Sequence, residues 1–173
     1  MFKSYIINRD LKLEKSIARI LFNNSLKIST AESCTGGLLS SRLTDISGSS
    51  VYISLNYVTY SNEAKNEILN VPMKIINEYG AVSRECARDM AEGLYEKSNS
   101  DIVVCTTGIA GPTGGSENKP IGLLYVAIKN QMNIEIKEYK LNPKLQRADM
   151  KYEFTQCALN QLLDFLNKNY LSN

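Results

Sequence analysis

The stretch that decides the fold is Lys27-Ile28-Ser29-Thr30-Ala31-Glu32-Ser33-Cys34-Thr35-Gly36-Gly37-Leu38-Leu39. A short β-branched run is followed by a segment of hydroxyls, a thiol and two glycines, and then by leucines at helical spacing. This order predicts a strand, a tight turn and a helix over about residues 36–46. Free N–H groups and the positive end of the dipole gather at a helix N-terminus, where they stabilise an anion or a developing oxyanion.

A second glycine-rich segment, Thr107-Gly108-Ile109-Ala110-Gly111-Pro112-Thr113-Gly114-Gly115-Ser116, follows the apolar run Ile102-Val103-Val104-Cys105. Two such loops in one small chain indicate a ligand site at the ends of neighbouring strands. The second loop resembles a phosphate cradle but fits neither G-x-x-x-x-G-K-[ST] nor a properly placed G-x-G-x-x-G. On composition alone it is equally well an ordinary loop.

The rest of the chain alternates helices with strands. Helices are expected over about residues 10–24, from about 61–63 to 69, from Pro72, from Ser83 to about 97 and from Pro143 onward. Strands are expected over 51–60 (one strand or a pair), 101–107, 121–128 and 132–139, the last two forming a hairpin. This order indicates an α/β domain with helices on both faces of a mixed sheet.

Composition sets limits on the function. The chain has 173 residues, 43% of them hydrophobic and 22% charged, with a net charge of +2. These values predict one soluble globular domain and give no field that would attract nucleic acid or a membrane surface. We find no apolar run near 18 residues and no secretory signal in residues 1–10, so a cytoplasmic location is expected. The role of residues 1–10 stays open.

The sequence contains no histidine. A Ser-His-Asp triad, a Cys-His dyad and any His-ligated metal site are therefore excluded within this chain. Glu32, Asp45 and Asp101 have no metal-ligand spacing, so neither metal nor cofactor is expected. If the protein is an enzyme, lysine, tyrosine or carboxylate groups must move the protons.

Ser33 in the first loop is the candidate nucleophile, and a neutral serine needs a base. The candidate base is Lys65 in Tyr60-Ser61-Asn62-Glu63-Ala64-Lys65, since a buried lysine can lose its proton near neutral pH. Lys65 would take the proton of Ser33 directly or through Tyr60. N–H groups at the start of the 36–46 helix, or those around Ser33 to Thr35, would hold the oxyanion. The alternative is that Ser33, Tyr60 and Lys65 are a turn hydroxyl, a sheet residue and a solvated charge.

Cys34 is the rival nucleophile, because a thiol at a helix N-terminus has a lowered pKa. Its alternative role is that of a small buried apolar residue. The four cysteines, Cys34, Cys86, Cys105 and Cys157, form no C-x-x-C pair and are expected to be buried free thiols. Lys119 and Arg147 are the cations available for a ligand phosphate, although residues of this kind are more often ordinary surface charges.

Four blocks of residues occur in the same order in one known family. They are Ala31-Glu32-Ser33-Cys34-Thr35-Gly36-Gly37-Leu38-Leu39, Tyr60-Ser61-Asn62-Glu63-Ala64-Lys65, Gly80-Ala81-Val82-Ser83, and Thr107-Gly108-Ile109-Ala110-Gly111-Pro112 with Gly114-Gly115 and Lys119-Pro120-Ile121-Gly122. Over about residues 12–166 the chain resembles the CinA C-terminal domain family, whose enzymatic members are nicotinamide-nucleotide amidases of the PncC type.

The resemblance implies a single α/β/α three-layer domain spanning residues 1–173 and a homodimer. It also implies a reaction of pyridine-nucleotide salvage, in which nicotinamide mononucleotide is deamidated to nicotinic acid mononucleotide and ammonia. Ser33 matches the family's nucleophile, and Tyr60 and Lys65 match the residues that activate it. The expected substrate-binding residues are Cys34, Thr35, Gly36, Gly37, Thr107, Gly108, Ile109, Ala110, Gly111, Gly114, Gly115 and Arg147.

Two departures from the family pattern affect these expectations. Many relatives carry two arginines four residues apart in the last helix, whereas here Arg147 is followed by Lys151, which keeps the charge but not the two-pronged guanidinium. Relatives also often carry an additional N-terminal domain, so the pyrophosphatase activity linked to that domain is expected to be absent. Two other functions stay open: a non-catalytic nucleotide-binding or competence/damage-response interaction module, and an amidase for a different small amide.

Overall fold

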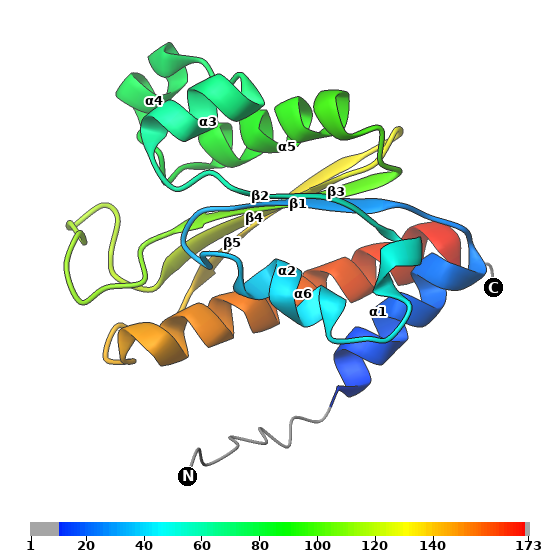
Figure 1. Cartoon of the computed structure of the whole chain (residues 1–173). Coiled ribbons are helices and arrows are strands. Elements are labelled where there is room, and N and C mark those ends of the chain that lie inside the picture. The colour runs from blue at the N-terminus through cyan, green and yellow to red at the C-terminus, as the bar shows by residue number, and fades with distance from the viewer. Residues whose placement is uncertain (1–10, 172–173) are drawn as a thin grey trace, which may run out of the picture.

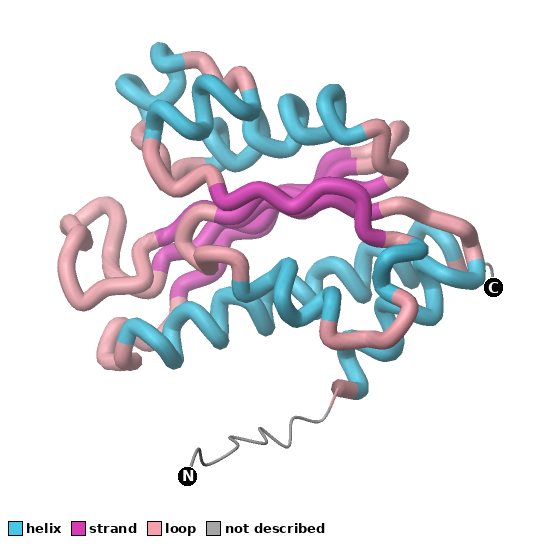
Figure 2. The backbone as a smooth tube through the Cα atoms, viewed as in Figure 1, coloured by secondary structure: helices cyan, strands magenta, loops and turns pink. Residues whose placement is uncertain are grey.

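A five-stranded mixed sheet forms the middle layer of the protein (Figures 1 and 2). The computed structural model describes residues 11–171, so the expectations for residues 1–10 and for the C-terminal end lie outside the described residues. The strands are β1 (Ile28–Glu32), β2 (Ile53–Val58), β3 (Ile102–Gly108), β4 (Leu123–Lys129) and β5 (Ile134–Lys140), in the order β2-β1-β3-β4-β5. β1 runs parallel to β2 and β3, whereas β4 is antiparallel to both of its neighbours.

Helices cover both faces of this sheet (Figure 1). On one face lie α3 (Asn62–Leu69), α4 (Met73–Tyr79) and α5 (Arg84–Ser98), and on the other lie α1 (Lys12–Asn23), α2 (Leu38–Thr44) and α6 (Arg147–Tyr170). A short 3-10 turn, Ser49–Val51, precedes β2. The three-layer α/β/α arrangement with a mixed sheet confirms the predicted fold class.

The central strand β3 packs against the helices on both faces of the sheet. It is buried on both faces, so its side chains alternate between two hydrophobic cores. Ile102 and Val104 pack in the core beneath α1 and α6, whereas Val103 and Cys105 pack in the core beneath α5. Burying each aliphatic side chain of this kind stabilises the fold by roughly 1.5–3 kcal/mol. Because both faces of β3 are buried, its sequence is a continuous apolar run.

Two element boundaries differ from prediction. The last helix begins at Arg147 rather than at Pro143, because Asn142 accepts backbone N–H groups from Lys144 and Leu145 and closes a separate turn. α2 begins at Leu38, because φ of +61° and +93° at Gly36 and Gly37 is outside the helical range. Of the two alternatives expected for residues 51–60, the single strand is the one observed, as β2.

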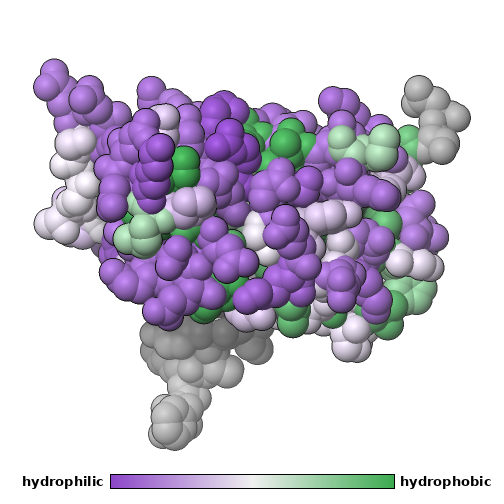
Figure 3. All heavy atoms as spheres, turned by 90° about the horizontal axis from the view of Figure 1, so that it is seen from above, coloured by the Kyte–Doolittle hydropathy of each residue, from purple (hydrophilic) through white to green (hydrophobic). Residues whose placement is uncertain are grey.

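The outer face of α3, α4 and α5 is mainly hydrophilic, with small, separate hydrophobic spots (Figure 3). Among the helices of residues 11–171, none combines the length and the hydrophobicity needed to cross a membrane.

Candidate active site

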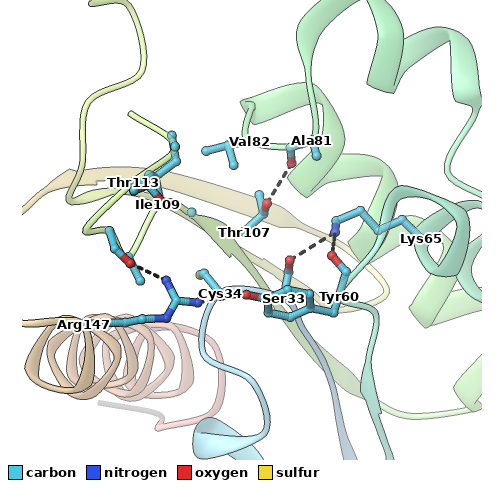
Figure 4. A pocket seen from close by; sticks show the side chains of 14 residues that line it. Ser33, Cys34, Tyr60, Lys65, Ala81, Val82, Thr107, Ile109, Thr113 and Arg147 are labelled. Carbon is cyan, nitrogen blue, oxygen red and sulfur yellow. Dashed lines mark hydrogen bonds between the residues drawn. The ribbon is translucent and has the colours of Figure 1, made fainter. Parts of the chain in front are cut away.

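The carboxyl ends of the three parallel strands lie at the same edge of the sheet, and the turns that follow them surround one cavity (Figure 4). Its volume is about 260 Å³. The lining residues are Ser33, Cys34, Tyr60, Lys65, Ala81, Val82, Thr107, Gly108, Ile109, Ala110, Gly111, Thr113, Gly114 and Arg147. The two glycine-rich segments are therefore brought together, in the arrangement typical of ligand sites in α/β proteins.

Ser33 and Lys65 are in direct contact in this cavity (Figure 4). Lys65 Nζ lies 3.1 Å from Ser33 Oγ, and it also contacts the carbonyl oxygens of Thr59 at 2.9 Å and Tyr60 at 3.2 Å. The Lys65 side chain is only 1% exposed. Within residues 11–171, no carboxylate forms a salt bridge with it.

This environment favours the neutral amine. Burial lowers the pKa of Lys65, and nearby Cys86, Cys34 and Glu63 only partly oppose that effect. A neutral amine has two hydrogens and one lone pair. The carbonyl oxygens of Thr59 and Tyr60 are its nearer acceptors and that of Ser61 is more distant at 3.5 Å, so the neutral form can donate to the nearer two and turn its lone pair to the Ser33 hydroxyl.

The start of α3 explains how Lys65 reaches the site. Ser61 is the N-cap residue of α3, and its Oγ accepts the N–H of Ala64 at 3.0 Å. Lys65 lies one turn into the helix, where its own N–H donates to the Ser61 carbonyl at 3.2 Å. The cap thus directs the side chain of Lys65 back toward the end of β2.

The turn after β1 corrects the expected oxyanion site. The buried carboxylate of Glu32 accepts the N–H groups of Gly37, Leu39 and Ser40, so the start of α2 has no free donor there. The N–H of Ser33 donates to the Thr106 carbonyl at 3.0 Å.

Two N–H groups of this turn, those of Cys34 and Thr35, donate to no carbonyl oxygen among the described backbone hydrogen bonds. Cys34 lines the cavity, whereas Thr35 is fully buried outside it. Of the N–H groups expected around Ser33 to Thr35, that of Cys34 is therefore the one available for an oxyanion.

Cys34 is not an activated thiol. Its side chain is buried beside Gly108, and burial raises its pKa to about 12 instead of lowering it. The expected lowering of the Cys34 pKa is therefore wrong, and the residue fits its alternative role of a small buried side chain. Cys34, Cys86 and Cys105 are buried free thiols as predicted, and Cys157 is a partly buried one.

Tyr60 lies beside Ser33 in the cavity, and Arg147 lines it farther along, beyond Cys34 (Figure 4). The Tyr60 hydroxyl accepts a hydrogen bond from Arg147 Nη2 at 2.9 Å, and Arg147 Nη1 donates to the Gly111 carbonyl at 2.5 Å. Tyr60 touches Lys65 through its backbone carbonyl. No described hydrogen bond joins its hydroxyl to Ser33 or Lys65, so the proposed relay through Tyr60 has no hydrogen-bonded path here.

The second glycine-rich loop is held close to the first. A Cβ on Gly108 would lie 2.6 Å from the Leu123 carbonyl oxygen and 3.2 Å from Cys34 Sγ, so only glycine fits there. The Thr107 hydroxyl donates to the carbonyl of Ala81 at 2.7 Å. Lys119 does not line the cavity, and its Nζ donates to the Tyr79 carbonyl at the end of α4. Its predicted phosphate contact therefore has no support.

Four predicted binding residues do not line the cavity. Thr35 is buried, and its hydroxyl contacts Thr106 Oγ1 at 2.8 Å. Gly36 and Gly37 line a neighbouring cavity together with Lys151, and Gly115 packs against Ile121.

Conversely, Ala81, Val82 and Thr113 line the main cavity although they were not predicted. The sequence signal for Ala81 and Val82 is the family block Gly80-Ala81-Val82-Ser83, to which residue type and spacing assign no chemical role.

Within residues 11–171, no three cysteine or carboxylate side chains converge in a way that suits a metal ion. The residues present instead define a class of site. A buried lysine faces a serine hydroxyl at the strand ends of an α/β/α protein, with backbone N–H groups beside them.

The chain belongs to the CinA C-terminal domain family, whose sequence profile matches residues 10–166. It is 52% identical over 164 residues to a CinA-like protein of Chlorobium chlorochromatii and 44% identical over 162 residues to one of Chlorobium limicola. These matches cover 95% and 92% of this chain but only 39% and 38% of the two relatives. The chain thus spans less than two fifths of their length.

Solved structures agree with this assignment. The competence/damage inducible protein CihA of Agrobacterium tumefaciens superposes with a TM-score of 0.84 at 39% identity, covering 90% of this chain and 95% of that one. A CinA superfamily protein of Klebsiella pneumoniae superposes with a TM-score of 0.87 at 27% identity, covering 93% and 99%. These names identify the family and its link to competence and damage response, and they do not specify a reaction.

Proposed function

We propose that this chain is an amidohydrolase that deamidates nicotinamide mononucleotide to nicotinic acid mononucleotide and ammonia. The observation that supports this most directly is the contact of 3.1 Å between Ser33 Oγ and the buried amine of Lys65. A serine beside a neutral amine is a nucleophile with its base, and this pairing requires no histidine.

In the proposed reaction, neutral Lys65 takes the Ser33 proton while Ser33 Oγ attacks the carboxamide carbon. The carbonyl π bond opens, and its electron pair becomes the oxyanion. The N–H of Cys34, which lines the cavity, holds this oxyanion, a contribution of roughly 3–4 kcal/mol.

The tetrahedral intermediate then collapses, and the C–N bond breaks. The Lys65 ammonium returns its proton to the departing nitrogen, and ammonia leaves. Water, deprotonated by Lys65, attacks the resulting ester. The C–Oγ bond breaks, Lys65 protonates Ser33, and the free acid leaves.

Arg147 and the second loop support a nucleotide substrate rather than free nicotinamide. Arg147 supplies a guanidinium at the rim of the cavity and already contacts the Gly111 carbonyl. Its remaining donors suit a phosphate or ribose hydroxyl group. Binding energy from these remote groups would position the carboxamide at Ser33.

The decisive experiment measures ammonia release from nicotinamide mononucleotide in the presence of a chelator. Wild-type protein should be active, and Ser33→Ala should lower kcat on the order of 10³-fold or more. Ser50→Ala is the matched control, because Ser50 is exposed on the turn before β2. Comparable activity of Ser33→Ala and wild type would refute the serine mechanism.

The second candidate is a nucleotide-binding or competence/damage-response module without catalysis, which the names of the relatives favour. Ligand binding by folded wild-type protein without ammonia release would support it. Ammonia release should also be compared among the mononucleotide, free nicotinamide and the dinucleotide. This comparison separates both functions from action on another small amide. The homodimer, the cytoplasmic location and the absence of a nucleic-acid or membrane partner stay predictions.

A further inference from the structure

The carboxylate of Glu32 is fully buried and forms no salt bridge within residues 11–171. Four donors satisfy it instead. Its Oε2 accepts the N–H groups of Gly37 at 2.9 Å and Leu39 at 3.0 Å. Its Oε1 accepts the N–H and the hydroxyl of Ser40 at 2.7 and 2.5 Å. The partial positive charge of the first turn of α2 therefore compensates this anion.

These contacts close the turn that carries Ser33. Glu32 holds the far end of the turn, and the N–H of Gly36 donates to the Ser33 carbonyl at 3.1 Å. The N–H of Ser33 donates to the Thr106 carbonyl, whereas the N–H of Cys34, which lines the cavity, donates to no described backbone carbonyl. The position of the Cys34 N–H thus depends on where Glu32 anchors α2.

We propose that Glu32 is a positioning residue for the oxyanion site, a role that rests on the amidase function proposed above. Its carboxylate accepts the N–H groups of Gly37, Leu39 and Ser40 and so anchors the start of α2. By doing so it fixes the turn that carries Ser33, and with it the N–H of Cys34, which lines the cavity. Glu32 itself does not touch the reacting atoms.

The first test is Glu32→Gln. The amide keeps the size of the side chain but turns one NH₂ group toward N–H donors, so the turn must move. We expect kcat for the mononucleotide to fall about 10²-fold, as on losing an oxyanion donor, with KM nearly unchanged. A merely structural role would instead lower the amount of folded enzyme and leave the kcat of the folded fraction unchanged.

Glu14→Gln is the matched control. Glu14 is also a buried carboxylate connected to α2, since Arg42 Nε donates to its Oε1 at 2.7 Å, but it lies outside the cavity. At a similar loss of Tm, Glu14→Gln should retain kcat. Wild-type kcat in folded Glu32→Gln, or an equal loss of kcat in both variants, overturns the proposal.

Amide hydrogen exchange keeps the proposal testable if Glu32→Gln does not fold. In wild-type protein, the amides of Gly37 and Leu39 should be strongly protected, because Glu32 is their acceptor. Exchange of both at the rate of an unstructured peptide overturns the positioning role. This measurement needs no activity, so a wild-type protein that releases no ammonia refutes the proposed function without deciding the role of Glu32.

Discussion

Ser33 and Lys65, 32 positions apart in sequence, place a hydroxyl and an amine 3.1 Å from each other. Ser33 comes from the turn after β1, and Lys65 comes from the first turns of the helix after β2. Since β1 and β2 are parallel neighbours, the two turns meet at one edge of the sheet. Removal of either side chain should therefore stop the same proton transfer.

Lys65 should control how activity depends on pH. Burial lowers its pKa, so kcat/KM should rise with pH as the amine loses its proton, with a midpoint below the ordinary lysine value of about 10.4. Lys65→Met should lower activity by about 10²–10⁴-fold and abolish this rise. A pH–rate profile of both proteins checks the prediction, and an unchanged profile in Lys65→Met would point to another base.

The same lowered pKa predicts a pH dependence of stability. Between the lowered pKa in the folded state and about 10.4 in the unfolded state, the unfolded chain binds more protons than the folded one. In that window the free energy of unfolding of wild type should rise with pH relative to that of Lys65→Met. Denaturant unfolding of both proteins across this window measures the difference, which should be constant at lower pH.

Cys34→Ala should retain activity within a few-fold of wild type. The pKa of about 12 leaves almost no thiolate near neutral pH, and the side chain acts through packing beside Gly108. Treatment of wild type with iodoacetamide at neutral pH should leave Cys34 unmodified, as read by mass spectrometry. Rapid alkylation at this position together with loss of activity would restore the thiol as a candidate nucleophile.

Arg147→Lys should weaken binding more than it slows the reaction. Lysine keeps the charge but cannot hold the Tyr60 hydroxyl and the Gly111 carbonyl at once. We expect KM for nicotinamide mononucleotide to rise about tenfold, or about 1.4 kcal/mol, with a smaller change for nicotinamide riboside, which lacks the phosphate. Steady-state kinetics with both substrates decide this, and equal effects on both would argue against a phosphate contact.

Substitutions at the buried ion pair of Glu14 and Arg42, outside the cavity, should change the free energy of unfolding. Arg42 contacts Glu14 at 2.7 Å and lies over the ring of Tyr152, yet Glu14 Oε2 and Arg42 Nη1 have no hydrogen-bond partner. Glu14→Gln alone should cost about 3–5 kcal/mol, because it leaves a buried guanidinium without its counter-charge.

Replacing both partners, as Glu14→Leu with Arg42→Met, should restore stability to the wild-type level or above. Thermal and denaturant unfolding test both variants. A double variant less stable than Glu14→Gln would show that the pair contributes more than its desolvation costs.

Much of the fold was predictable because the signals are local. The apolar run of β3 and the capping serines of α3 and α5 mark elements through backbone preferences that act over a few residues. The start of α6 was not predictable, because Pro143 is equally suited to a helix and to the turn that Asn142 closes. The start of α2 was misplaced because the conformations of two adjacent glycines are not specified by their sequence.

By itself, the sequence determined the α/β class, the exclusion of histidine chemistry and the identity of Ser33 and Lys65 as a candidate pair. Only the tertiary structure decided which groups meet. It assigned the N-terminus of α2 to Glu32, raised the pKa of Cys34 by burial, and turned the Tyr60 hydroxyl toward Arg147. The physical reason is that hydrogen-bond partners and desolvation depend on contacts between residues far apart in the chain, which spacing along the sequence does not report.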